Sequence, residues 1–290
     1  EADRLGIRLL ARAGFDASAM ASMFEILQAT GGSDGAPEFL RTHPLSGNRI
    51  AEAKNRAARM EQGDARRDSL AFHLIKRRIA VVRTDNPDRL AQRWAQQEPP
   101  ATSFAASAHT YGLALLDLRR EAPERAIERL QRLRERSPDE RHYGAALARA
   151  HAASGDRAAA LEVWRHLDAL YPRSFPVAAL GADLLREAES PRAAMDHLID
   201  YLRRDPRAPG PAWRKLAQVA DAADDPVSRH EALGEYYART ARLDEATRQF
   251  ELALERADEG SSDHKRIAAR LEQVRALKRQ RVAHNPVSGN

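Results

Sequence analysis

Hydrophobic residues recur along this chain at the three- and four-residue spacing of helices, and the blocks they form repeat with a period of about 34 residues. Three columns keep this period, namely a small residue, a large apolar residue one turn later and a closing proline: Ala126, Ala160 and Ala194; Leu130, Trp164 and Leu198; Pro138, Pro172 and Pro206. The small residue lets two helices approach, the large one fills the space between them, and proline ends the second helix. The pattern therefore predicts stacked helix pairs.

The clearest helix pair covers residues 141–174, with neighbouring copies at about 107–140 and 175–208. A period of about 34 residues is that of the tetratricopeptide repeat, and these copies resemble that family. The resemblance implies an all-α, right-handed superhelical solenoid, which we expect to span residues 69–282. Helix pairs in such arrays bury their apolar faces only by stacking on their neighbours.

The register of the repeat shifts after Pro206. One extra helix, at about 211–223, is expected before a new pair led by Leu233 and Ala246. A final helix at about 263–281 carries Ile267 and Leu271 at helical spacing and is expected to cap the stack. Residues 69–99 read as a degenerate opening pair, and residues 283–290 as a disordered tail.

Residues 1–62 do not follow the repeat and predict three helices joined by glycine-containing breaks. Three strings in this segment are EADRLG at 1–6, ARAGFD at 11–16 and FLRTHPLSGNRI at 39–50. Together with the repeats they resemble the beta-barrel assembly-enhancing proteases of the Gram-negative periplasm. That family consists of zinc metallopeptidases of the HExxH type with a tetratricopeptide tail. Residues 1–62 would then be the C-terminal remnant of the metallopeptidase domain.

The resemblance implies roles near the active site for Asp3, His43 and Arg49. Asp3 would orient a zinc ligand, His43 would lie over the cleft near the zinc, and Arg49 would hold the loop that carries His43. Asp3 could instead simply favour the start of its helix, and His43 could be an ordinary loop histidine. The sequence contains no HExxH, so we expect no zinc ligand and no peptidase activity in the chain as it stands, which would begin just after the last ligand. Zinc would belong to the full-length family protein.

Composition and charge change this picture little. The chain has no cysteine, which excludes disulfides and thiolate metal sites, and no apolar run approaches the roughly 20 residues that cross a bilayer. The net charge is +5, but 47 basic and 42 acidic residues are interleaved along the helices. Such alternation is typical of solvated helix faces, so we expect no nucleic-acid partner.

The first helix of each pair should line the concave side of the solenoid, where a polypeptide could bind. The repeat phase gives these candidate binding residues: Tyr111, His142, Arg149, Asp183, Arg214, Gln218, Glu235 and Arg239. The resemblance implies a periplasmic protein whose solenoid binds the outer-membrane assembly machinery and unfolded barrel proteins. The alternative is a free-standing interaction adaptor without peptidase activity.

Overall fold

The computed structural model describes residues 1–30, 47–60, 65–66, 68–97 and 103–284, which form fifteen α-helices and one isolated β-bridge. The contacts between Cα atoms divide the chain into two compact units, Glu1–Ile75 and Lys76–Asn290. The division falls inside one helix, α4 (Leu70–Arg83). Each unit is described below by itself.

The first unit contains three helices, α1 (Ala2–Arg12), α2 (Ala19–Thr30) and α3 (Gly47–Ala58). Helix α3 packs on both α1 and α2, and their shared core includes Ile7, Phe24 and Ile50. The chain turns at Gly14, which has a positive φ of 76°. The three helices predicted for residues 1–62 are confirmed.

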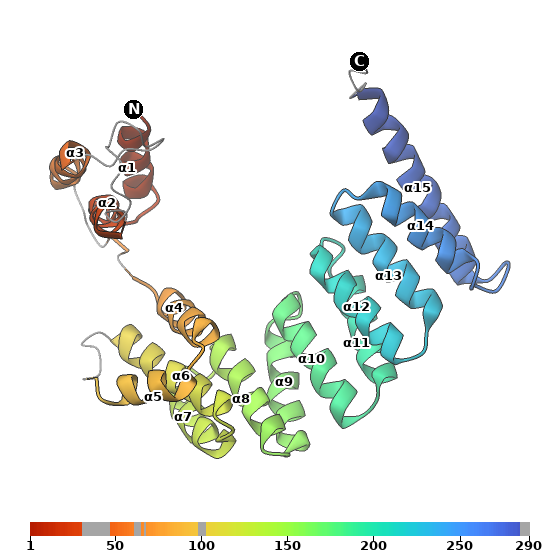
Figure 1. The fold of residues 1–290 in the computed structure, drawn as a ribbon, viewed down its shortest axis with the longest axis horizontal. Helices are drawn as coiled ribbons and strands as arrows, with labels where there is room; N and C mark the ends of the chain where they lie inside the picture. The colour runs from red at the N-terminus through yellow and green to blue at the C-terminus, as the bar shows by residue number, and fades with distance from the viewer. Residues whose placement is uncertain (31–46, 61–64, 67, 98–102, 285–290) are drawn as a thin grey trace. The chain divides into compact units, whose positions relative to one another are not determined.

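The second unit is a series of helices in chain order, each packed against the next in the series from α5 to α15 (Figure 1). After α4, which is shared with the first unit, their bounds are α5 (Pro87–Ala95), α6 (Ser103–Arg119), α7 (Pro123–Arg136), α8 (Arg141–Ala153), α9 (Arg157–Leu170), α10 (Phe175–Ala188), α11 (Pro191–Arg204), α12 (Gly210–Ala222), α13 (Pro226–Arg239), α14 (Leu243–Leu254) and α15 (Ser262–His284). The all-α prediction of consecutive helix pairs is confirmed.

Local sequence explains where these helices begin. Asp156 caps α9 by accepting a hydrogen bond from the Ala159 N–H, 2.9 Å from its Oδ1, and Ser190 caps α11 in the same way. Proline occupies the first turn of α5, α7, α11 and α13, where no N–H is needed. The turns before α7 and α9 place Glu121 and Gly155, which are one repeat period apart, at positive φ. The repeat is therefore visible in the backbone as well as in the sequence.

Two of the three predicted columns, the alanines and the large apolar residues, form the core of the second unit, whereas the prolines of the third column, Pro138, Pro172 and Pro206, are exposed. The four alanines early in the second helices are fully buried, and the large residue one turn later is buried beside each of them: Ala126 with Leu130, Ala160 with Trp164, Ala194 with Leu198, and Ala246 with Phe250. Glycine is required where helices cross most closely. A Cβ added at Gly181 would lie 2.2 Å from Trp164 Cε2, so α9 and α10 can approach only because that side chain is absent.

The shift of register after Pro206 is confirmed as one additional helix. Helix α12 packs on both α11 and α13, and α13 packs equally on α14. Helix α15 buries Ile267, Leu271 and Val274 against α14. The apolar run of α15 does not stay covered to its end, because Leu277 is half exposed. Helix α15 extends to His284, and residues 285–290 of the predicted tail lie outside the described residues.

Candidate functional site

The first helices of three successive pairs, together with the additional helix α12, form one continuous face of the second unit. Helices α6, α8, α10 and α12 contact one another in succession, more closely than α7, α9 and α11 do. A stack whose alternate helices approach on one side and separate on the other must curve toward the closer side. We call the exposed side of α4, α6, α8, α10 and α12 in this unit the inner face.

Charged residues at repeat-related positions line this inner face. Arg149 on α8 and Asp183 on α10 are one repeat period apart and therefore occupy the same position in successive first helices. Asp183 accepts a hydrogen bond from Lys215 Nζ on α12, with 2.5 Å between Nζ and Oδ1. Partial burial and the neighbouring Arg78 cation lower the pKa of Arg149. The predicted Arg149 and Asp183 are thus brought together, and Arg78 and Lys215 join them.

Tyr111, predicted on the exposed side, is instead fully buried on α6. Its ring packs against that of Tyr143 on α8, with 5.8 Å between the ring centroids. Burial raises the pKa of Tyr111 and raises the pKa of Tyr143 to about 12. Tyr111 is therefore part of the core beneath the inner face.

His142 has a local structural role at the start of α8. Glu140 accepts a hydrogen bond from the His142 backbone N–H (3.1 Å), and its carboxylate lies 2.6 Å from His142 Nδ1. These hydrogen bonds lower the pKa of Glu140. The pair caps the helix, and both partners are largely occupied by that contact.

The remaining predicted residues lie on α12 and α13. Arg214 lies over the ring of Tyr236 and Arg239 over the ring of Trp213, at 5.8 Å and 5.4 Å from the centroids. Gln218 is exposed one turn beyond Lys215 on α12. These contacts leave Gln218 as the polar side chain most open to a partner among those predicted on α12.

Glu235, also predicted as exposed, is buried beneath α15. Arg270 donates to both of its carboxylate oxygens, at 2.5 Å and 3.1 Å, and Arg266 pairs with Glu231 in the same way one turn earlier. These pairs border a groove of about 660 Å³ between α11, α12, α13 and α15. The charged residues that border this groove lie opposite residues of the other sign. Ion pairing between neighbouring helices therefore accounts for the charges in the groove.

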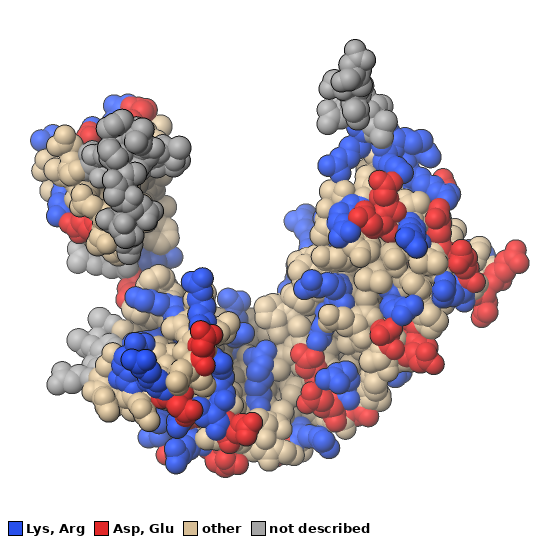
Figure 2. All heavy atoms as spheres, in the orientation of Figure 1, with Lys and Arg blue, Asp and Glu red and all other residues tan. Residues whose placement is uncertain are grey.

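Opposite charges are mixed over the visible surface of the chain. Figure 2 shows Lys and Arg side chains interspersed with Asp and Glu on the face it presents. Many form pairs within one helix or between neighbouring helices, such as Arg204 with Asp168, 3.3 Å apart. The described part of the chain contains no helix long and apolar enough to cross a membrane.

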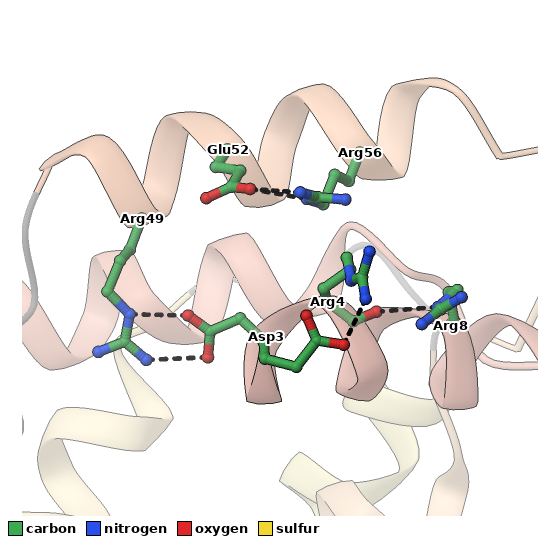
Figure 3. Close-up of polar contacts among 7 residues, drawn as sticks. Asp3, Arg4, Arg8, Arg49, Glu52 and Arg56 are labelled. Carbon is green, nitrogen blue, oxygen red and sulfur yellow. Dashed lines mark hydrogen bonds and ion pairs between the residues drawn. The ribbon is translucent and has the colours of Figure 1, made fainter.

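In the first unit, Asp3 and Arg49 form a two-point ion pair between α1 and α3 (Figure 3). Arg49 Nε lies 2.7 Å from Asp3 Oδ2, and Nη2 lies 2.9 Å from Oδ1. The hydrogen bonds from Arg49 lower the pKa of Asp3 and raise that of Arg49, and the guanidinium also lies 5.0 Å from the centre of the Phe24 ring. The ion pair therefore fixes Asp3 as a carboxylate. His43 lies outside the described residues.

Comparison with known proteins finds a peptidase family that matches the first unit and relatives that match both units in the same order along the chain. Residues 1–57 match the family described as Peptidase family M48. The chain is 30% identical over 279 residues to the beta-barrel assembly-enhancing protease of Escherichia coli K12, covering 96% of this chain and 56% of that protein. This chain is a relative of the beta-barrel assembly-enhancing proteases.

The beta-barrel assembly-enhancing protease of Yersinia pestis is 28% identical over 280 residues, with 96% of this chain and 57% of that protein covered. The chain thus spans about half the length of the curated relatives it matches. The predicted resemblance to this family is confirmed, and the match runs through the repeats as well as residues 1–57.

Among solved structures, a TPR protein of Thermus thermophilus matches at 20% identity and a TM-score of 0.38, covering 69% of this chain and 98% of that one. Yeast Tom70 matches at 13% identity and a TM-score of 0.41, covering 93% and 61%. Both likenesses are distant, so the fold of this relative of the beta-barrel assembly-enhancing proteases rests on its own helix contacts.

The match of residues 1–57 to Peptidase family M48 implies zinc in a full-length protein of that kind. Within the described ranges, no three His, Cys, Asp or Glu side chains come together as metal ligands. Asp3, which the resemblance predicts to orient a zinc ligand, is bonded to Arg49. The described residues therefore do not fit a zinc ion, and what they provide is the ordered Asp3–Arg49 pair.

Proposed function

We propose that this chain serves within a periplasmic zinc metallopeptidase that assists outer-membrane barrel assembly and quality control. The observation that carries the proposal is the match to the beta-barrel assembly-enhancing proteases over 96% of the chain. The inner face supports it, because stacked first helices provide an extended surface on which another polypeptide can lie. The partners we propose are unfolded barrel proteins and the outer-membrane assembly machinery.

The first unit has a supporting role in this proposal. Large apolar side chains of α1 and α2, such as Leu5, Leu9 and Met23, are exposed at 46%, 63% and 47%. Several large exposed apolar residues on a small helical unit are typical of a surface that other protein covers. We propose that the rest of a metallopeptidase domain covers them, with Asp3, Arg49 and His43 near its active site.

Binding of an unfolded barrel protein to the purified chain tests the proposal. The chain should bind a urea-unfolded, rapidly diluted outer-membrane barrel protein saturably, and at least about tenfold more tightly than an unfolded soluble protein of similar length, a difference of about 1.4 kcal/mol. Fluorescence anisotropy of the labelled unfolded protein measures both affinities. Equal affinity for the two would contradict the proposal and favour a free-standing adaptor.

A further inference from the structure

Helix α4 carries an exposed apolar stripe along one side. Every third or fourth residue of this side is large and apolar. The exposed fractions of its four members are 58% for Phe72, 47% for Ile75, 50% for Ile79 and 70% for Val82. Elsewhere among the described residues of α5 to α15, exposed large apolar residues occur singly, as Phe104 on α6, Leu170 on α9 and Leu277 on α15. The stripe is therefore a feature of α4 and not of the repeat.

The other side of α4 attaches the helix to the second unit. Leu74 and Val81 are buried, and the Arg77 guanidinium lies 4.5 Å from the centre of the Trp94 ring. Arg119 of α6 also donates a hydrogen bond to the Val81 carbonyl. Helix α4 is therefore held by one side while its stripe stays open to solvent.

The spacing of the stripe is that of a coiled-coil seam. Its members are separated by three, four and three residues, as are the a and d positions of a heptad. At the α-helical repeat they cover about 80° of the helix circumference. A helix that packs on a broad apolar layer carries a stripe of roughly 100° or more. The narrow stripe of α4 therefore fits a single partner helix better than a membrane surface.

Positive charges border the stripe on both sides. Lys76 and Arg83 occupy the e positions of the heptad and Arg78 a g position, all three are exposed, and α4 contains no acidic residue. Two copies paired along this stripe would place these cations opposite one another, e against g in a parallel pair and e against e in an antiparallel one. Like charges at such positions destabilise a helix pair. The charges therefore disfavour a second copy of the chain and favour a helix with Asp or Glu beside its apolar seam.

We infer that α4 is a docking site for an amphipathic helix of a partner protein, apolar at its a and d positions and acidic at its e and g positions. The apolar residues of the partner cover the stripe, and its carboxylates face Lys76 and Arg83. The inference goes beyond the proposed function, because it concerns a helical partner of α4 and not an unfolded barrel protein. Either can fail while the other stands.

Two labelled helical peptides with the same apolar a and d residues test this inference on the full chain. One peptide carries Glu at its e and g positions, and the other carries Lys there. The Glu peptide should bind at least about tenfold more tightly in anisotropy titrations, because charges at these positions set partner choice. The double variant Lys76→Glu, Arg83→Glu should reverse the preference in favour of the Lys peptide, a gain of binding that misfolding cannot produce.

Ile79→Asp should weaken binding of the Glu peptide at least about tenfold, since it places a charge in the apolar seam. Leu277→Asp is the matched control, because Leu277 is 49% exposed on α15 and its replacement should leave this affinity unchanged. Equal affinity of the chain for the two peptides, or equal loss in the two variants, would overturn the inference. Dimerisation of the chain, or its binding to vesicles of anionic lipid, would also overturn it if Ile79→Asp abolished that association.

A cysteine probe shows whether the stripe is open before a partner binds. The chain has no cysteine, so Ile79→Cys introduces a single thiol on the stripe. Without peptide, a maleimide should label it about as fast as the single thiol of Leu277→Cys. With the Glu peptide at ten times its Kd, labelling at position 79 alone should slow about tenfold, since only about one chain in ten is then free. Slow labelling without peptide, in this chain or in a longer protein that contains it, would show that the protein covers its own stripe and would contradict the inference.

Discussion

Replacing Trp164 by alanine is expected to lower the free energy of unfolding of the repeat unit by about 3–5 kcal/mol. Trp164 lies between α9 and α10, almost completely buried, and its Nε1 donates to the Val177 carbonyl at 3.2 Å. The ring also packs edge-on to His197, with 4.9 Å between centroids. Removing it leaves a cavity between two helix pairs that share this side chain.

Urea denaturation followed by circular dichroism at the helix band measures this loss. Leu170→Ala is the control, because Leu170 belongs to the same helix but is 43% exposed and should cost less than about 1 kcal/mol. Similar losses for the two variants would show that Trp164 does not join the pairs as the structure describes.

Gly181→Ala is expected to destabilise the same unit by about 2 kcal/mol, although alanine is the better helix former. The added Cβ would lie 2.2–2.4 Å from three atoms of the Trp164 indole. Overpacking of this kind costs about 1–3 kcal/mol, and the severity of the overlap places it near the upper end. The helix propensity of alanine offsets about 1 kcal/mol.

The double variant with Trp164→Leu separates these two effects. Without the indole the overlap disappears, so Gly181→Ala should become neutral or stabilise the Trp164→Leu protein by up to about 1 kcal/mol. Urea midpoints of the four proteins give the coupling energy. A cost for Gly181→Ala that is equal in both backgrounds would contradict the close crossing of α9 and α10.

Much of the fold could be predicted because one physical pattern repeats. The alanine and large-residue columns, the additional helix and the capping helix all follow from which residues face a neighbouring helix, which is a local property of the sequence. The position of Trp164 follows from the column alone, and its burial confirms it. Periodicity fixes the face of a helix on which a residue lies.

Periodicity does not fix what covers that face. Tyr111 and Glu235 were predicted as exposed, yet Tyr111 lies beneath α8 and Glu235 beneath Arg270 of α15, 35 residues later. Arg78 was missed because the α4–α5 pair departs from the repeat consensus, so no column indicated its position. The charge of Arg78 acts on Arg149, which joins α4 to α8, two helices that are far apart in the sequence, and the one available signal was that Arg149 itself was predicted on the inner face.

The central claim is that the inner face, formed by the first helices, holds the bound polypeptide. Site-specific photocrosslinking tests it most directly, with a photoreactive residue at Gln218 on the inner face or at Arg132 on the second helix α7, both exposed. We expect an unfolded barrel protein to crosslink to position 218 and not to position 132. Crosslinks of equal yield at both positions, or at position 132 alone, would contradict the claim.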